Sequence, residues 1–464
     1  MLAALLLMAM HETPVWALDV AAPEPPAATT PTASIDARTP IDSDEPETPN
    51  STELGHTQMS DSFLNRPIAT LLHESSLVGL RDTTFDAQLR SYYYDRDNMD
   101  HTTSLAWTLG GSAGVKTGYF GDFVALGATG YTSQRLVGPL DEDGTPLLQP
   151  GQKPYTVLGE LYGEFKVTDQ VLATVGDRGF NTPFINTQDA VMTPYTYLVY
   201  GLQGKIGSTE DRALSFGAAY VDKIKERNSE DFESMATAAG APAGVTRGVS
   251  VAGANYKVGQ LSIGAVEYYS ADIINIAYSE MRYAIALPDN MQLLLHAQYT
   301  DERSTGENLL TGKFFSTHMV GLKTELAMGP ALFTMARTLT AVGTIGSPGS
   351  GTGILSPWGG YAGYTAVMIE NFDRAGENAT LLRAAYNFPS PTGLSVYGLW
   401  VNGSTPNVVS QYAQQEYDAT VQWSAPSGVL NGLELLARFA HVSQEGPSNE
   451  HQTQVRFILY YTFR

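Results

Sequence analysis

The stretch QTQVRFILYYTF, residues 452–463, alternates apolar and polar side chains over most of its length. Side chains two residues apart point to the same side of a β-strand, so this rhythm predicts a strand with one apolar and one polar face. The apolar face carries Val455, Phe457, Leu459, Tyr461 and Phe463, and the polar face carries Gln454, Arg456 and Thr462.

The same rhythm recurs along the chain from about residue 84. In TVLGELYGEFKV, residues 156–167, it predicts an apolar face of Val157, Leu161, Phe165 and Val167 and a polar face of Thr156, Glu160, Tyr162, Glu164 and Lys166. Most such runs are 10–14 residues long. Globular strands usually have about 5–6 residues, whereas roughly 9–11 cross a membrane at a tilt. The predicted strands are 84–94, 103–116, 121–132, 155–167, 170–177, 196–207, 213–222, 246–257, 260–270, 274–286, 291–300, 315–328, 331–340, 379–388, 393–402, 414–424, 433–443 and 451–463.

The connections between these strands alternate between short and long. Short turns are 117–122, 168–169, 288–290 and 329–330, and long loops are 133–154, 178–195, 223–245, 301–314 and 341–378. This alternation is typical of outer-membrane barrels, which close because an open edge in lipid leaves backbone groups unsatisfied. Single-chain bacterial barrels have an even number of strands, which favours treating 341–378 as one loop. The sequence therefore predicts an all-β fold, a transmembrane antiparallel β-barrel of 18 strands with short periplasmic turns and long extracellular loops.

The composition excludes several classes of protein. None of the 464 residues is Cys, which excludes a disulfide scaffold and Cys-ligated metal sites. The net charge of −21 argues against nucleic-acid binding, and no run of about 18 apolar residues predicts a membrane helix. The motifs HExxH, Walker A and complete GxGxxG are absent from the sequence. We therefore predict no enzyme activity, no catalytic residues, no cofactor and no metal site.

The first 75 residues differ from the rest of the chain. Residues 1–17 contain an apolar run and a small-residue cleavage site, which predicts a signal peptide, with a disordered apolar terminus as the alternative. Residues 18–75 begin with a Pro-rich, acidic segment that buries too little apolar area to offset its ordering entropy. We predict a flexible leader there, serving as a tether or binding a periplasmic partner, and a barrel domain over 80–464.

Two motifs in the barrel region resemble those of a known family. LRSYYYDRD at 89–97 and NFDRAGEN at 371–378 resemble segments of the OprD family of outer-membrane porins, and the Tyr-rich stretch 264–283 is similar to its middle region. The resemblance implies an 18-stranded channel in the bacterial outer membrane, surrounded by lipid and often packed as a loose homotrimer. It also implies that small solutes, many with a carboxylate, pass a narrow eyelet between a ladder of basic side chains and an acidic wall.

The strand phase identifies which charged side chains face the lumen. It places five arginines inside the barrel: Arg90, Arg282, Arg383, Arg438 and Arg456. Closure puts the last strand beside the first, so Arg438, Arg456 and Arg90 are expected on three adjacent strands. A guanidinium binds a carboxylate bidentately, and a row of them would pass an anionic solute from site to site. The alternative is that lumen carboxylates such as Glu416 neutralise these arginines, which then brace the wall.

Acidic lumen residues and one loop complete the predicted site. Glu160 and Glu164 lie across the barrel from the arginines, where they would create a transverse field for zwitterions or be ordinary solvated groups. The loop 341–378 is the best candidate for the eyelet, and 178–195 is the second. The resemblance places Arg374 and Glu377 near that eyelet, although they would equally form an ion pair that holds the loop.

We therefore predict a porin for passive, partly selective diffusion of small anionic or zwitterionic solutes that carry carboxylates, such as amino acids and organic or aromatic acids. One alternative is a less selective general or oligosaccharide porin, which aromatic side chains in the pore would favour. The other alternative is a non-conducting barrel that acts as an adhesin or an enzyme.

Overall fold

The computed structural model describes residue 75 and residues 77–209, 212–348, 351–406, 412–445 and 449–463. The predicted signal peptide and all of the predicted leader except Ser75 lie outside the described residues. Among the residues that are described, no helix is long and apolar enough to cross a membrane.

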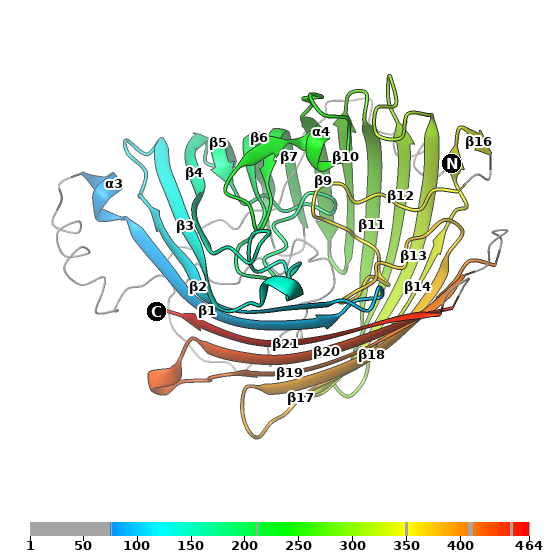
Figure 1. The fold of residues 1–464 in the computed structure, drawn as a ribbon. Coiled ribbons are helices and arrows are strands. Elements are labelled where there is room, and N and C mark those ends of the chain that lie inside the picture. The colour runs from blue at the N-terminus through cyan, green and yellow to red at the C-terminus, as the bar shows by residue number, and fades with distance from the viewer. Residues whose placement is uncertain are drawn as a thin grey trace.

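The described chain forms a closed antiparallel β-barrel (Figure 1). Of its 21 strands, β8, β15 and β16 are short pairs within loops, which leaves 18 in the wall, as the sequence predicts. Each wall strand pairs with the next, and β1 pairs with β21 to close the barrel. The wall strands are β1 (Thr84–Asp97), β2 (Thr103–Lys116), β3 (Val124–Val137), β4 (Tyr155–Thr168), β5 (Val171–Arg178), β6 (Thr196–Thr209), β7 (Arg212–Lys225), β9 (Val249–Val258), β10 (Leu261–Ser270), β11 (Ile274–Ala286), β12 (Gln292–Ser304), β13 (Phe315–Met328), β14 (Ala331–Thr340), β17 (Asn378–Asn387), β18 (Leu394–Ser404), β19 (Ala413–Ser424), β20 (Leu433–Glu445) and β21 (Glu450–Thr462).

Long connections lie at one end of the barrel and short ones at the other. The long ones used below are L2 (138–154), L3 (179–195), L4 (226–248) and L7 (341–377). L2 holds the 3-10 turn η1 (Leu140–Glu142), L4 holds β8 (Phe232–Ser234) and the helix α4 (Met235–Ala238), and L7 holds β15 (Thr344–Ile345) and β16 (Ser347–Pro348). At the short-turn end lie the helix α3 (Val78–Arg81) and the 3-10 turn η2 (Gly428–Leu430). L7 is one loop between β14 and β17, which confirms the assignment from strand parity.

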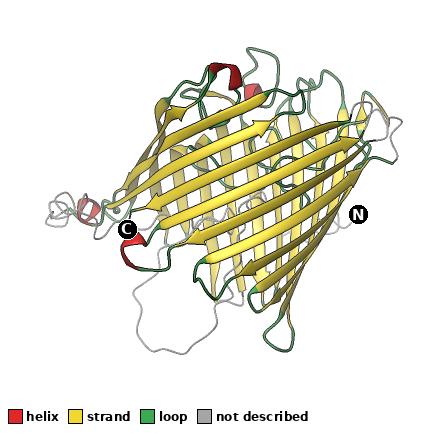
Figure 2. Ribbon diagram, turned by 60° about the horizontal axis from the view of Figure 1, so that its bottom comes forward, coloured by secondary structure: helices red, strands yellow, loops and turns green. Residues whose placement is uncertain are grey.

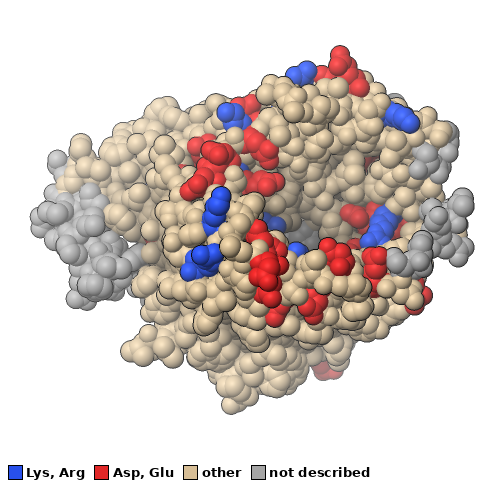
Figure 3. Space-filling view, viewed as in Figure 1, with Lys and Arg blue, Asp and Glu red and all other residues tan. Residues whose placement is uncertain are grey.

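The outer surface of the barrel is apolar, as the two-residue rhythm requires. Large apolar side chains on wall strands remain exposed, among them Leu126, Leu161, Leu202, Leu322, Phe333, Met335, Leu382, Phe439 and Phe457. The tilted strands form a continuous wall (Figure 2), and on the face shown in Figure 3 most charged side chains gather around the mouth. Exposed apolar area of this extent is stable in lipid and not in water.

One strand departs from the predicted phase. In β4 the register passes from the pair Thr129–Glu160 directly to Gly130–Leu158, so Gly159 has no partner. Because a bulge adds one residue, Leu158 and Leu161 both face outward. The prediction that Val157 faces outward and Thr156 inward was therefore wrong, whereas Glu160 and Glu164 do face the lumen, as expected.

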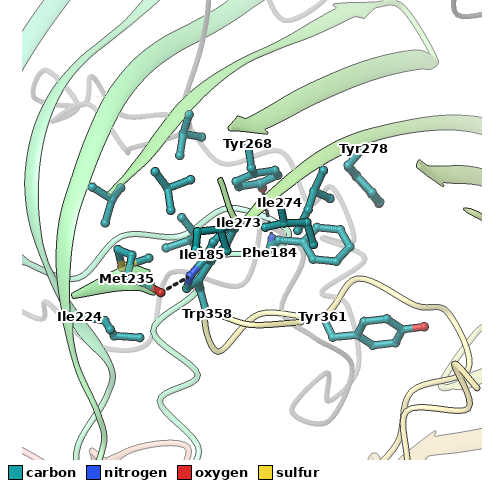
Figure 4. Packing of buried hydrophobic residues seen from close by; sticks show 14 of the residues in the cluster. Phe184, Ile185, Ile224, Met235, Tyr268, Ile273, Ile274, Tyr278, Trp358 and Tyr361 are labelled. Carbon is teal, nitrogen blue, oxygen red and sulfur yellow. Dashed lines mark hydrogen bonds between the residues drawn. The ribbon is translucent and has the colours of Figure 1, made fainter. Parts of the chain in front are cut away.

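The interior beside β6, β7, β9, β10 and β11 is filled by loops. Trp358 and Tyr361 of L7, Phe184 and Ile185 of L3 and Met235 of L4 pack against this wall in one apolar cluster (Figure 4). The Trp358 indole N–H donates to the Met235 carbonyl at 2.9 Å. The Tyr197 hydroxyl on β6 reaches the carbonyls of Asn186 and Trp358 at 2.8 and 2.9 Å, which ties L3 to L7. The loops therefore fill the side of the barrel interior next to these strands.

Candidate functional site

Two arginines lie side by side on the wall opposite the filled side. Arg438 on β20 and Arg456 on β21 are direct cross-strand partners, and both point inward as the phase predicts. The Arg456 guanidinium donates to the Met368 carbonyl of L7 at 3.3 Å and lies 5.6 Å from the Tyr94 ring centre. Two like charges side by side repel each other, and an anion bound on their lumen side would reduce that repulsion.

Arg438 and Arg383 share one aromatic partner. The Arg438 guanidinium donates to the Tyr397 hydroxyl at 3.1 Å, and the Arg383 guanidinium lies 4.3 Å from the centre of the same ring. Arg438 is 3% exposed, so the aromatic wall around it excludes most water. This contact extends the row of guanidinium groups from β21 through β20 to β17.

Arg90 lies on the adjacent strand but has a different set of partners. Its guanidinium binds both carboxylate oxygens of Asp189 at 2.5 Å and donates to the Val191 carbonyl at 2.7 Å. Asp189 and Val191 belong to L3, so Arg90 anchors this loop to β1. A bidentate pair of this kind is strong and directional, because two guanidinium nitrogens each donate to one carboxylate oxygen.

Two carboxylates on β19 hold the tip of L7. Glu416 accepts the backbone N–H groups of Ile369 and Glu370 at 2.7 and 2.9 Å, and Asp418 accepts that of Met368 at 3.2 Å. Both side chains are buried. With these N–H groups occupied, the Met368 carbonyl points to Arg456, so the tip of L7 lies against that arginine.

Arg374 and Glu377 lie at the end of L7, in the family-like motif. Glu377 accepts the backbone N–H of Arg374 at 3.0 Å and a Gln414 amide hydrogen at 2.9 Å. The Arg374 guanidinium lies 3.9 Å from the Tyr412 ring centre and 3.4 Å from Glu370. Burial raises the pKa of Glu377, and burial together with the Glu377 charge raises the pKa of Asp373 to about 7. The motif thus packs the base of L7 against the wall.

The acidic residues on β4 also have specific partners. Glu160 accepts the Gly179 backbone N–H at 2.7 Å, which fixes the start of L3. Glu164 binds Lys116 at 2.8 Å, Arg178 at 3.4 Å and the Tyr119 hydroxyl. Both face the lumen, but each is engaged with the wall or with L3.

A cavity of about 700 Å³ adjoins the contact between Met368 and Arg456. Three guanidinium groups line it, from Arg96 on β1, Arg227 on L4 and Arg456 on β21, together with the carboxylates of Asp143 and Asp189. Sequence reasoning missed Arg96, although its strand phase matches that of Arg90. It also missed Arg227, because a loop side chain carries no phase signal.

Arg282 lies in a separate group of charges on the far wall. Arg282 lies directly opposite His296 on the neighbouring strand, and His296 lies directly opposite Lys323 on the next strand. The sequence analysis singled out neither His296 nor Lys323, although both lie at inward positions of their strands.

Comparison with known proteins agrees with the barrel fold. The model of the family described as outer membrane porin, OprD family, matches residues 80–464. No curated protein matches the chain. Among solved structures, OccAB3 of Acinetobacter baumannii is similar at 18% identity, covering 82% of this chain and 99% of its own, with a TM-score of 0.70. OccK9 (OpdG) of Pseudomonas aeruginosa has 18% identity, 84% and 99% coverage and a TM-score of 0.71. OpdK of the same organism, solved with vanillate, has 20% identity, 82% and 98% coverage and a TM-score of 0.68.

Proposed function

Because the chain belongs to the OprD family of outer-membrane porins, we propose that it lets small carboxylate-bearing solutes diffuse selectively past the Arg438–Arg456 pair. The family consists of channels of the bacterial outer membrane, not of enzymes. The cross-strand arginine pair beside the tip of L7 is the observation that carries the proposal. The solute class is supported by the three guanidinium groups around the outer cavity, and OpdK, of the same fold, was solved with vanillate, an aromatic carboxylate.

The proposed path follows from the positions of the charges. A carboxylate enters the outer cavity at Arg96 and Arg227, moves to Arg456 beside the Met368 carbonyl, and then reaches Arg438 and Arg383. Each guanidinium offers several N–H donors and stays charged at every relevant pH. Arg90 is engaged by Asp189, so its part is to hold L3 and not to bind the solute.

Solute uptake by liposomes tests the proposal. Replacing both Arg438 and Arg456 by Ala removes two charge-assisted donors of about 1.5–3 kcal/mol each, so we expect swelling rates for benzoate-type solutes to fall at least tenfold. Swelling with a small neutral sugar should be unchanged or faster. Arg303→Ala is the matched control, because Arg303 is an exposed arginine on β12 that pairs with Asp301. Wild-type carboxylate uptake in the double variant would contradict the proposal.

A less selective channel for neutral oligosaccharides is the second candidate. The lumen tyrosines Tyr94 and Tyr397 beside the arginines favour it, because aromatic faces stack on sugar rings. The same swelling assay separates the two functions, since an oligosaccharide porin would pass neutral sugars faster than carboxylates of equal size. An adhesin or enzyme that does not conduct would show no single-channel current.

Two parts of the proposal concern the whole assembly. We propose export through a signal peptide at residues 1–17, followed by a leader at 18–75, and the N-terminal sequence of the mature protein tests this. We also propose a homotrimer, as the family resemblance implies, and the sedimentation of the detergent-solubilised protein tests that.

A further inference from the structure

A group of charged side chains on β11, β12 and β13 takes no part in the proposed path. Glu280 and Arg282 lie on β11, His296 lies on β12, and Lys323 and Glu325 lie on β13. Arg282, His296 and Lys323 are cross-strand partners in one row, so the five side chains share one patch of the lumen wall.

His296 lies at the centre of this patch between two carboxylates. Its Nε2 is 2.7 Å from Glu325 Oε2, and its Nδ1 is 3.8 Å from Glu280 Oε1. The imidazole is 7% exposed. Two nearby carboxylates favour the charged imidazolium form, because it carries the opposite charge.

The patch also contacts L7, through Tyr364. The Tyr364 hydroxyl donates to Glu280 Oε1 at 3.0 Å, and its ring meets the His296 ring edge-on at 6.1 Å between centres. The Lys323 ammonium lies 5.1 Å from the centre of the same ring. Tyr364 is buried and stands four residues before Met368, whose carbonyl meets Arg456. The charge of the patch therefore acts on the segment that narrows the passage.

We propose that His296 is a positioning residue whose protonation sets how firmly L7 is held against the far wall. In its charged form it neutralises Glu280, the carboxylate that holds Tyr364. When His296 loses its proton, Glu280 has less compensating charge, turns toward lumen water, and releases Tyr364. L7 then loosens, and the passage beside Arg456 widens. This inference concerns the width of the passage in the proposed function, and it does not depend on which solute crosses.

The groups that face His296 set the direction of the response. Glu280 from β11 and Glu325 from β13 favour its charged form, whereas Arg282 from β11 and Lys323 from β13 oppose it. From L7 the Tyr364 hydroxyl, and from β11 the Tyr278 hydroxyl at 3.2 Å, donate to Glu280 and stabilise its charge. Histidine is the side chain that titrates between about pH 5 and 8, so the response is expected in that range.

Single-channel conductance in KCl tests the inference, since it needs no carboxylate solute. We expect the wild-type conductance to rise about twofold from pH 5.5 to pH 8. In His296→Gln, which keeps a polar side chain but cannot become charged, that rise should shrink to less than half. Tyr364→Phe, which loses the donor to Glu280, should conduct at pH 5.5 like the wild type at pH 8. His318→Gln is the control, because His318 is exposed on the outer face of β13.

A second measurement reports the position of L7 directly. The chain has no Cys, so Val367→Cys supplies a single thiol beside the outer cavity. At one fixed pH near 6, we expect a water-soluble thiol reagent to modify it several-fold faster when His296→Gln is also present. Equal modification rates, or a His296→Gln channel that titrates like the wild type, would overturn the inference. Loss of carboxylate selectivity in the arginine variants would leave it untouched.

Discussion

At the scale of single residues, two arginines of the same wall differ in what holds them. Asp189 binds both terminal guanidinium nitrogens of Arg90. Arg456 instead donates to the Met368 carbonyl and lines the outer cavity. Both were predicted to face the lumen from strand phase alone. The phase cannot distinguish them, because the partner of Arg90 comes from a loop about a hundred residues away.

The Arg90–Asp189 pair is expected to stabilise the barrel and narrow it. Asp189→Asn leaves a buried guanidinium without its countercharge, which costs about 3 kcal/mol in the free energy of unfolding. L3 also loses its anchor, so conductance should rise. Denaturant unfolding in detergent and single-channel recording measure both effects. Asp141→Asn, at an exposed position of L2, should change neither, and a neutral Asp189→Asn would show that L3 is held by its apolar contacts alone.

Asp373 in L7 is expected to make the stability of the folded protein depend on pH. Burial and the nearby Glu377 charge raise the pKa of Asp373 to about 7 in the folded protein, above its ordinary value of 3.8. The folded state therefore holds a proton that the unfolded chain releases, so stability falls as pH rises from about 4 to about 7. Asp373→Asn should remove this loss. The difference in melting temperature between variant and wild type should thus grow from pH 5 to pH 8, and a constant difference would contradict the assignment.

At the scale of the strand, the two-residue rhythm predicts the wall because lipid and water select opposite faces of every strand. It fails locally at Gly159, where the bulge in β4 turns Leu158 outward. A glycine in a strand suggests a bulge but does not locate one, since neighbouring strand glycines such as Gly163 remain paired. The rhythm also places His296 inward, yet only the structure brings Glu280, Glu325 and Tyr364 to it.

The outward face of β13 offers a direct test of the membrane belt. Leu322, about midway along the strand, is 60% exposed. Leu322→Arg places a charge in the hydrocarbon region and should cost about 2–4 kcal/mol of folding free energy in bilayers. Leu140→Arg is the control, because Leu140 is 72% exposed in η1 of L2, outside the wall. Its expected effect is within about 0.5 kcal/mol. Equal effects of the two substitutions would place β13 outside the membrane.

At the scale of the whole molecule, the sequence predicts the number of strands, the order of short and long connections and the length of L7. It does not predict which loops fold inward. The apolar cluster joins Ile185, Met235 and Trp358, which are far apart in the chain, and no local pattern encodes that contact. This cluster holds L3, L4 and L7 in the barrel interior, where the tip of L7 meets Glu416 and Arg456.

The seam between β1 and β21 has a consequence for biosynthesis. β21 completes the hydrogen-bonded ring, and it supplies the partners of residues 88–97. A chain that lacks β21 would leave β1 and β20 as unpaired strand edges. Unpaired backbone N–H and C=O groups are unfavourable in lipid. We expect such a fragment to insert poorly into the outer membrane and to be degraded by proteases. Closure of the ring therefore makes stable insertion conditional on the presence of β21.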